Sequence, residues 1–443
     1  MLILALRRWA ALDAAERSRL LARSTAVVFD AELMAGIERI FTDVRARGDA
    51  AVADATERFD RVRIPPDQLR VPGADLERAH GSADPRLLEG IREAIRNSRL
   101  FNEAQVAETG QGWRREVRPG FELGEQFSPI PSAGLFVPTG KASYPSVLCQ
   151  VGTPAVVAGV PEITVVVPPV PGSSEVDPAT LAVAVELGLA SVFRANGPAA
   201  IAALAFGTES IPKVAKVVGP GSPAVTAAQV LAQRYGTATT MLCGPSESLL
   251  IADDSADPWR LAMDLLNEAE HGSDSAATLI TDSRALAEAV DAAVADQILG
   301  LPDVRASAAR VALSDLGGVI LVDSMDQAVD VASEYAAEHV QIATRDPEAT
   351  LRALRYAGEA LLGQDTPIGA SSFTIGIPAT LPTGGYAKVN GGVTARTFTT
   401  STSIARLSPD ALAGLASPTL ALADHEGFPA HANAFRLRGL GSD

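Results

Sequence analysis

The stretch EITVVV, residues 162–167, is a short run of mostly β-branched residues with prolines on both sides. An apolar run of this length between turn-forming residues is typical of a strand that is buried on both faces. Similar runs predict further strands at Gly134–Val137, Ser191–Arg194, Lys213–Val218 and Thr237–Leu242. Helix candidates lie between these strands at 145–158, 178–188, 198–206 and 223–235. This alternation predicts a parallel sheet with helices on its faces.

The same alternation starts again after residue 247. Strands are predicted at Leu249–Ala252, Ala277–Thr281 and Val319–Val322, with helices near 257–270, 284–298 and 325–337. Two such blocks predict an α/β fold built from two incomplete Rossmann-like modules. Gly219-Pro-Gly-Ser222 follows one strand and opens a helix, but it lacks the third glycine of a dinucleotide fingerprint. It is therefore either a phosphate-binding loop or only a tight turn.

The two ends of the chain and the segment 363–402 do not show this alternation of strands and helices. Residues 9–25 and 30–60 show helical periodicity, with Asp30 as a predicted N-cap and Gly48 as a predicted break. Residues 363–402 are rich in Gly, Thr and Ser, and a long irregular segment in a compact domain is more often functional than idle. Residues 408–437 return to helical periodicity.

Composition excludes several classes of protein. The chain has 443 residues, a formal net charge of −16 and only two cysteines, Cys149 and Cys243. The negative charge disfavours nucleic acid or an anionic membrane as a partner. Two cysteines cannot form a framework of disulfides, and a reducing compartment suits them. With no apolar run long enough to span a membrane, we expect a soluble, cytoplasmic protein.

Histidines that stand beside carboxylates are the candidates for chemistry. Glu268 and His271 are three residues apart near a predicted helix end, so they share one face and are able to hold a divalent metal. The alternative is a solvated helix end that Gly272 terminates. Glu338-His339 is able to supply a base and a water-orienting group in a cleft, or it is an exposed helix terminus. His431, close to Glu426, reads by itself as a surface residue.

Several motifs together resemble the histidinol dehydrogenase family, almost from end to end. They are Ala46-Arg-Gly-Asp49, Ile201-Ala-Ala-Leu-Ala-Phe-Gly-Thr208, Gly219-Pro-Gly221, Gly244-Pro-Ser-Glu247, Glu270-His-Gly272, Glu338-His339 and Leu381-Pro-Thr383. The resemblance implies a homodimer with one zinc ion per chain. It also implies oxidation of L-histidinol to L-histidine through an aldehyde, in two hydride transfers to NAD.

The resemblance also implies roles for individual residues. His339 would remove protons during the hydride steps, and Glu338 would activate the water that hydrates the aldehyde. His271 and His431 match two zinc ligands, with His431 supplied by the partner subunit. Ser246 and Glu426 match positions that contact the substrate, and Glu426 would also lie at the subunit interface.

Other positions depart from the family pattern around the metal and the substrate. Glu268 stands in place of a glutamine ligand, and Ser372 in place of an aspartate ligand. We expect a rearranged zinc site of Glu268, His271 and His431, with a coordination position left open. The alternative is that Ser372 marks a lost site. Ala379 replaces a histidine near the substrate, so we expect that L-histidinol is not the natural substrate.

The cofactor side differs as well. Phe136 replaces a tyrosine, and Ala199 and Ser222 replace a glutamine and an asparagine that contact the dinucleotide. Lys141 is a new charge beside this region, where it would meet a phosphate or remain a solvated lysine. These changes imply another binding pose for NAD, weaker binding or none.

From these observations we predict a zinc- and NAD-dependent dehydrogenase that oxidises a small polar alcohol, either an amino alcohol or a hydroxy acid. The alternatives are an authentic L-histidinol dehydrogenase and a binding or regulatory paralogue that has lost turnover. The expected domains are an N-terminal helical arm (1–28), a discontinuous first module (29–133 and 248–392), an inserted second module (134–247) and a C-terminal dimerisation tail (393–443).

Overall fold

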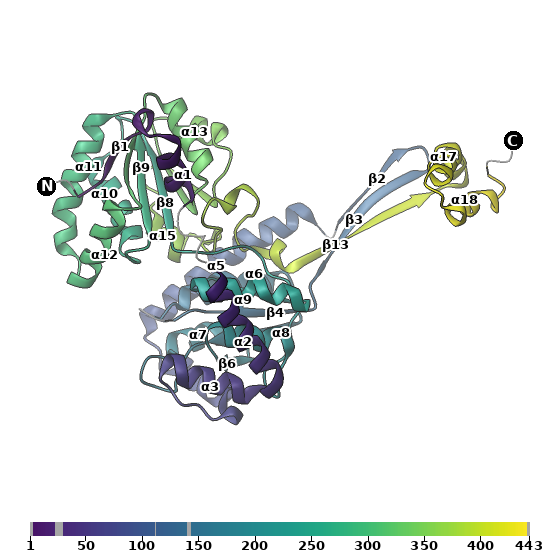
Figure 1. The fold of residues 1–443 in the computed structure, drawn as a ribbon, viewed down its shortest axis with the longest axis horizontal. Coiled ribbons are helices and arrows are strands. Elements are labelled where there is room, and N and C mark those ends of the chain that lie inside the picture. The colour runs from purple at the N-terminus through teal and green to yellow at the C-terminus, as the bar shows by residue number, and fades with distance from the viewer. Residues whose placement is uncertain (1–2, 23–29, 111, 140–142, 441–443) are drawn as a thin grey trace. The chain divides into compact units, whose positions relative to one another are not determined.

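The computed structural model describes residues 3–22, 30–110, 112–139 and 143–440. The chain forms two compact units, which are described separately (Figure 1). The larger unit holds Met1–Glu103 and Ile130–Phe398, and the smaller unit holds Ala104–Pro129 and Thr399–Asp443. The larger unit contains two parallel sheets with helices on their faces, which confirms the predicted α/β class.

The first parallel sheet has six strands in the order β1-β10-β9-β8-β11-β12. Their bounds are Leu6–Arg8 (β1), Glu247–Ala252 (β8), Ala276–Thr281 (β9), Gly318–Leu321 (β10), His339–Ala343 (β11) and Glu359–Leu362 (β12). The side chain of Leu250 packs into one core, whereas its neighbours Leu249 and Ile251 pack into another on the opposite face. This alternation follows from the two-residue period of a strand, and it explains why the strands read as continuous apolar runs.

Helices cover both faces of this sheet. One face is packed by α10 (Pro258–Ala269), α11 (Arg284–Gln297) and α12 (Asp303–Ser314). The other face is covered by α13 (Met325–Tyr335) together with Trp9, which precedes α1 (Ala14–Ala22). Two shorter helices complete this part, α14 (Pro347–Ala353) and α15 (Ile368–Phe373).

The second parallel sheet has four strands in the order β6-β5-β4-β7. They are Ser132–Phe136 (β4), Glu162–Val167 (β5), Val192–Arg194 (β6) and Lys216–Val218 (β7). Numbered within the sheet, this order is 3-2-1-4, the order in which the first four strands of a doubly wound dinucleotide-binding sheet lie. One face packs on α6 (Pro145–Val157) and α7 (Pro178–Glu186), and the other on α8 (Gly197–Phe206) and α9 (Pro223–Ala232).

The N-terminal helices pack on the four-stranded sheet. The segment contains α2 (Ala31–Arg47), α3 (Asp49–Asp60), α4 (Gly73–Gly81) and α5 (Pro85–Thr109). Asp30 caps α2 by accepting a hydrogen bond from the Leu33 N–H at 2.8 Å, and Gly48 ends that helix, as predicted. Phe41 of α2 lies in one core with Phe136 and Ile201. This packing differs from the expected grouping of residues 29–133 with residues 248–392, because apolar faces decide the partner and sequence order does not.

Two further expectations differ from the structure. The segment 1–28 was expected as a helical arm, yet β1 extends the six-stranded sheet by pairing with β10, with Leu6 opposite Val319; residues 1–2 and 23–28 lie outside the described part. Thr237–Leu242 forms no regular strand and contributes only an isolated bridge between Ala238 and Lys216. An apolar run predicts burial more reliably than it predicts pairing, and Thr237 is indeed fully buried.

The smaller unit is built from an antiparallel sheet and three short helices. Its strands are Gly112–Arg118 (β2), Phe121–Pro129 (β3) and Thr399–Leu407 (β13), in the order β13-β3-β2. The helices are α16 (Pro409–Gly414), α17 (Ala416–His425) and α18 (Pro429–Arg436). Among the described residues of both units, no helix is both long and apolar enough to cross a membrane.

Candidate active site

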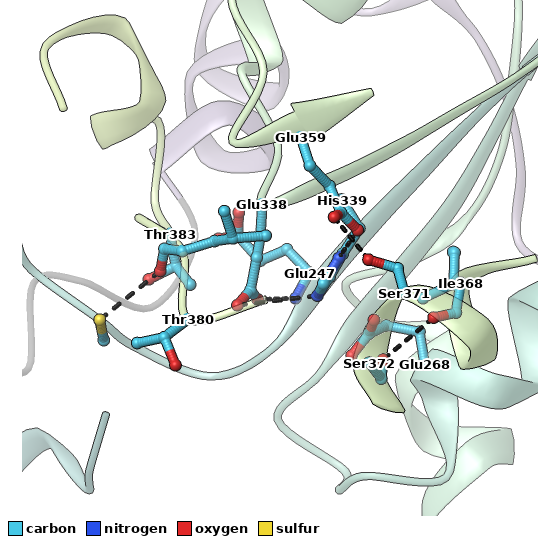
Figure 2. Close-up of polar contacts among 12 residues, drawn as sticks. Glu247, Glu268, Glu338, His339, Glu359, Ile368, Ser371, Ser372, Thr380 and Thr383 are labelled. Carbon is cyan, nitrogen blue, oxygen red and sulfur yellow. Dashed lines mark hydrogen bonds and ion pairs between the residues drawn. The ribbon is translucent and has the colours of Figure 1, made fainter. Parts of the chain in front are cut away.

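The candidate catalytic residues gather at one edge of the six-stranded sheet, where β8, β11 and β12 begin (Figure 2). Glu247, His339 and Glu359 are the first residues of these three strands, and Glu338 immediately precedes β11. In the register of the sheet, His339 lies opposite Ser248 on one side and opposite Glu359 on the other. The topology therefore brings together side chains that are separated by up to 112 residues in the sequence, from Glu247 to Glu359.

His339 is held from two directions. Its Nδ1 atom lies 2.5 Å from Oε1 of Glu359, and the Ser371 hydroxyl donates to Oε2 of Glu359 at 2.6 Å. Its Nε2 atom lies 3.8 Å from Oε1 of Glu338, which is beyond hydrogen-bond distance. The ring is therefore fixed at Nδ1, while its second nitrogen faces the neighbouring carboxylate without bonding it.

Glu338 is positioned by the start of β8. The backbone N–H of Glu247 donates to Oε2 of Glu338 at 3.1 Å. The Glu247 side chain in turn accepts a hydrogen bond at Oε1 from the Gly384 N–H at 2.8 Å. Glu247 thus connects the Glu338-His339 pair with the loop that follows Leu381-Pro-Thr383.

Burial and mutual charge shift the protonation of both members of the pair. Burial raises the pKa of Glu338 to about 8, and the negative charges of Glu268 and Glu247 add to the rise, against the opposing effect of His339. Burial by itself would lower the pKa of His339, but Glu338 and the hydrogen bond with Glu359 outweigh it and raise that pKa to about 10. Both groups therefore keep their protons to a higher pH than they would in water, and perturbed pKa values of this kind are common at proton-transfer sites.

A second Glu–His pair lies at the end of α10. Oε1 of Glu268 is 3.4 Å from Nδ1 of His271, and the Glu268 side chain is buried while 46% of the His271 side chain is exposed. Oε1 of Glu268 accepts no hydrogen bond from any described group. A buried carboxylate oxygen in this condition favours a cation, so Glu268 and His271 fit two ligands of a zinc ion.

The other predicted metal ligands are placed differently. Ser372 lies on α15, which packs against α10, and its hydroxyl donates to the Ile368 carbonyl at 3.1 Å. His431 and Glu426 belong to the smaller unit, where both are exposed and the His431 ring contacts the Phe428 ring at 5.2 Å between centroids. Over the ranges that the structure describes, no three His, Cys, Asp or Glu side chains gather as a metal-binding group.

Two of the three predicted substrate positions, Ser246 and Ala379, are half-buried. The Ser246 carbonyl accepts a hydrogen bond from the Ala276 N–H at 3.0 Å, so Ser246 is placed directly before β8. Ala379 lies in the segment between α15 and Leu381, beside Thr380, whose hydroxyl is 3.4 Å from the Gln150 side-chain oxygen. Gln150 also donates to the Ser372 carbonyl at 2.5 Å, so it ties α6 to both parts of this segment.

The predicted cofactor positions surround the end of β4 in the four-stranded sheet. Phe136 is the last residue of β4 and Gly219 directly follows β7, so both stand where the strand order reverses, which is where nucleotides bind in doubly wound sheets. Phe136 and Ala199 are, however, 1% and 2% exposed and belong to the core. Ser222, the N-cap of α9, is exposed. Lys141 lies outside the described residues.

The structure adds Glu359, which no sequence pattern singled out, as the partner of His339, and it gives Glu247 of the Gly244-Pro-Ser-Glu247 motif a role as a link to Glu338. It also decides against the exposed helix terminus that was one of two alternatives for Glu338-His339, because both side chains are buried. Helix α13 stops at Tyr335 with Ala336 in a left-handed conformation, and β11 begins at His339. The three-residue connection, residues 336–338, turns the pair toward the sheet edge.

Fold and site together define an α/β protein with an acid–base cluster and a neighbouring pair of potential metal ligands at the edge of a parallel sheet. The family model described as histidinol dehydrogenase matches residues 24–439. The chain therefore belongs to the histidinol dehydrogenase family, which confirms the predicted resemblance. Enzymes of this family are NAD-dependent oxidoreductases that act on a CH–OH group.

Individual relatives cover nearly the whole chain. A histidinol dehydrogenase of Rhizobium meliloti is 40% identical over 92% of both chains. A histidinol dehydrogenase homolog of Colwellia psychrerythraea is 38% identical over 96% of this chain and 94% of its own. The crystal structure of histidinol dehydrogenase from Elizabethkingia anophelis covers 100% of both chains with a TM-score of 0.92 and 30% identity.

Proposed function

We propose that this protein is a zinc- and NAD-dependent dehydrogenase that oxidises a small amino alcohol other than L-histidinol. The observation that carries the proposal is the buried Glu338–His339 pair, in which the imidazole Nε2 is 3.8 Å from the Glu338 carboxylate. A buried acid–base pair is an arrangement for proton transfer, and contact between the two groups raises the pKa of His339 to about 10 while burial raises that of Glu338 to about 8.

The residues of the pair have separate tasks in this proposal. His339 accepts the proton of the substrate hydroxyl at Nε2 as the carbon–hydrogen bond is broken. Glu338, with a pKa near 8, takes a proton from a water molecule in the second oxidation, in which the aldehyde is hydrated on the way to an acid. When bound, NAD accepts the hydride. The retained Glu338-His339 dipeptide therefore favours oxidation through to the acid.

Zinc would be held by Glu268, His271 and His431 of the partner subunit, since the family works as a homodimer. The fit rests on the unsatisfied Oε1 of Glu268 and its 3.4 Å distance from His271. When bound, zinc acts as a Lewis acid on the substrate oxygen. Ser372 is already bonded to the Ile368 carbonyl, which supports a site that does without it.

NAD would lie across the carboxyl ends of β4 and β7. Of the three side chains at family contact positions, only Ser222 is exposed, and Phe136 and Ala199 are packed in the core. The strand order at β4 and β7 thus favours dinucleotide binding, whereas two of the three side chains at the family contact positions are buried away from a ligand. We propose that NAD binds here through backbone groups and Ser222, with a pose different from that of the family.

An amino alcohol is favoured over a hydroxy acid by charge. The site holds the carboxylates of Glu247, Glu268, Glu338 and Glu359, and the first two already raise the pKa of Glu338. A protonated amine would relieve this repulsion, whereas a substrate carboxylate would increase it. Ala379 removes the side chain of a family histidine at the substrate, so part of the contact surface for L-histidinol is absent.

A second candidate function is binding or regulation without turnover. The burial of Phe136 and Ala199 favours it, because both would have to present a surface to NAD in the family mode. The acid–base pair and the Glu268–His271 pair oppose it. An authentic L-histidinol dehydrogenase is the remaining alternative, and it would be favoured if L-histidinol were oxidised faster than other amino alcohols in a direct rate comparison.

The first experiment is metal analysis of the purified, tag-free protein before and after chelation, followed by titration with NAD. We expect about one zinc per chain, lost in His271→Ala and retained in His425→Ala, a matched exposed histidine. We also expect saturable NAD binding and NADH formation with at least one amino alcohol. If the protein contains no zinc and binds no NAD, a binding or regulatory function is favoured over the dehydrogenase function.

A further inference from the structure

Glu359 and His339 begin neighbouring parallel strands and are paired in register. Residues paired in this way project from the same face of a sheet, with backbones about 4.8 Å apart. The carboxylate of Glu359 reaches Nδ1 of His339 at 2.5 Å, so the contact is a direct product of the register between β11 and β12 (Figure 2). A shift of one residue would point the carboxylate to the opposite face.

Both oxygens of Glu359 have a partner. Oε1 meets His339, and Oε2 accepts the Ser371 hydroxyl at 2.6 Å from helix α15. The three residues are buried, with exposures of 7% for Glu359, 6% for His339 and 2% for Ser371. A buried carboxylate is tolerated when it is paired and hydrogen-bonded, so each contact here is strongly favoured. The Glu359 rotamer is consequently fixed, and the imidazole plane with it.

We propose that Glu359, anchored by Ser371, is the positioning residue that sets the tautomer of His339 and leaves Nε2 as the proton acceptor. A neutral imidazole has one N–H and one lone pair. Because Nδ1 faces a carboxylate, that nitrogen keeps the hydrogen and the lone pair stays on Nε2. Nε2 forms no hydrogen bond with Glu338, because its distance of 3.8 Å from Oε1 of Glu338 is too long.

The arrangement also stabilises the product of proton transfer. When Nε2 takes a proton from the substrate hydroxyl, the oxygen keeps the electron pair and the ring becomes an imidazolium. The Nδ1–H bond to Glu359 then becomes a bond between opposite charges, which is stronger than the neutral one. This is the relation between histidine and carboxylate in catalytic triads, here with a serine that holds the carboxylate. The proposal rests on the proposed role of His339 as the base.

The test is ¹H–¹⁵N NMR of histidine-labelled protein without substrate, with the His339 signal assigned by its loss in His339→Gln. We expect a downfield Nδ1–H resonance in the wild type that persists in Glu334→Gln, a matched exposed glutamate. The resonance should move upfield in Glu359→Gln, which keeps the size and loses the charge. A smaller shift is expected in Ser371→Ala, which removes one bond and leaves the carboxylate, so the test survives if Glu359→Gln does not fold.

Steady-state kinetics of the same variants provide a second test of the positioning role. For Glu359→Gln we expect kcat to fall by about 10–100-fold with little change in KM, the typical effect of groups that orient a functional histidine. The acid limb of the pH–rate profile should move to lower pH. The positioning role would be overturned if the neutral wild-type ring, recorded above the His339 pKa of about 10, carried its hydrogen on Nε2. It would also be overturned if the Nδ1–H signal did not move in Glu359→Gln. An intact NMR signature without turnover of any alcohol would instead refute the dehydrogenase function and leave the positioning role standing.

Discussion

Oε1 of Glu268 lies 3.4 Å from Nδ1 of His271, although the first side chain is buried and the second is half-exposed. The two residues leave the end of α10 from one face, as their three-residue spacing requires. No described group donates a hydrogen bond to this carboxylate oxygen. The pair therefore supplies two of the three ligands that we propose for zinc, and a buried carboxylate oxygen without a hydrogen bond favours a cation beside it.

Ser372→Asp should tighten zinc binding. An aspartate on α15 would add a carboxylate from the helix that packs against α10, and hard oxygen ligands add to affinity when they reach the ion. We expect about a 10–100-fold gain, the range over which changes around metal sites commonly act. Competition with a zinc-binding dye measures it. Ser372→Asn, which adds similar bulk without charge, is the control, and an equal gain in that variant would contradict the carboxylate argument.

Stability should fall as pH rises because of Glu338 and His339. Their folded pKa values, about 8 and about 10, both lie above the ordinary values of 4.5 and 6.5. A group with a raised folded pKa stabilises the fold fully below its unfolded pKa and loses that contribution as pH rises through the folded pKa. Both groups thus contribute in the same direction, with Glu338 losing its share between pH 4.5 and 8 and His339 between pH 6.5 and 10.

Thermal unfolding of the metal-free protein from pH 5 to pH 10 checks this. The melting temperature of the wild type minus that of Glu338→Gln/His339→Gln should decrease with increasing pH. The exposed pair Glu334→Gln/His425→Gln serves as the control for the number of substitutions and should give a flat difference. A difference that widens toward pH 10 would mean that the folded pKa values of Glu338 and His339 are not raised.

Both cysteine thiols should be unreactive in the folded protein. Burial raises the pKa of Cys149 to about 12, and burial together with the charge of Glu338 does the same for Cys243. At pH 8 only about one thiol in 10⁴ would be ionised, and the thiolate is the nucleophile. A thiol reagent should therefore react at the rate of local opening, and rapidly with two equivalents after denaturation. Fast reaction of one thiol in the native state would show that its core segment opens readily.

Sequence patterns predicted the elements of this fold better than their partners. The β-branched runs at Glu162–Val167 and Leu249–Ala252 became buried strands, and Asp30 caps α2. Glu359 escaped notice because its role depends on a register with His339 across twenty residues and an intervening helix. Phe136 was predicted at a cofactor position, yet it is packed in the core, since an aromatic side chain in a strand looks the same in sequence whether it faces a ligand or a helix.

Two glycines with positive φ should respond differently to alanine. Gly188 has a φ of +72° and open space at the position of a Cβ, so Gly188→Ala should cost only the left-handed conformation, about 1–2 kcal/mol. Gly219 has a φ of +138°, and a Cβ there would lie 2.1 Å from the Phe136 carbonyl oxygen. Gly219→Ala should therefore cost a further 1–3 kcal/mol or so, as overpacking does. Urea unfolding of both variants measures the difference, and equal costs would mean that β4 and β7 separate easily.

Restoring the family residue should have different effects at the two cofactor positions Ser222 and Ala199, because Ser222 is exposed and Ala199 is buried. Ser222 is exposed and caps α9 without a side-chain hydrogen bond, and asparagine is an equally good N-cap. Ser222→Asn should leave stability unchanged and add one hydrogen bond to NAD, which corresponds to about a 2–10-fold lower Kd. Ala199 is fully packed in α8, so Ala199→Gln should destabilise by about 1–3 kcal/mol and bring no gain in affinity.

Calorimetric titration with NAD and a melting temperature for each variant decide between these outcomes. If Ala199→Gln binds NAD more tightly at unchanged stability, α8 must open to admit the side chain, and the family mode of binding would be available after all. If neither variant nor the wild type binds NAD, the proposed NAD site at the ends of β4 and β7 is wrong. Only a gain confined to Ser222→Asn is consistent with a dinucleotide held through the exposed start of α9.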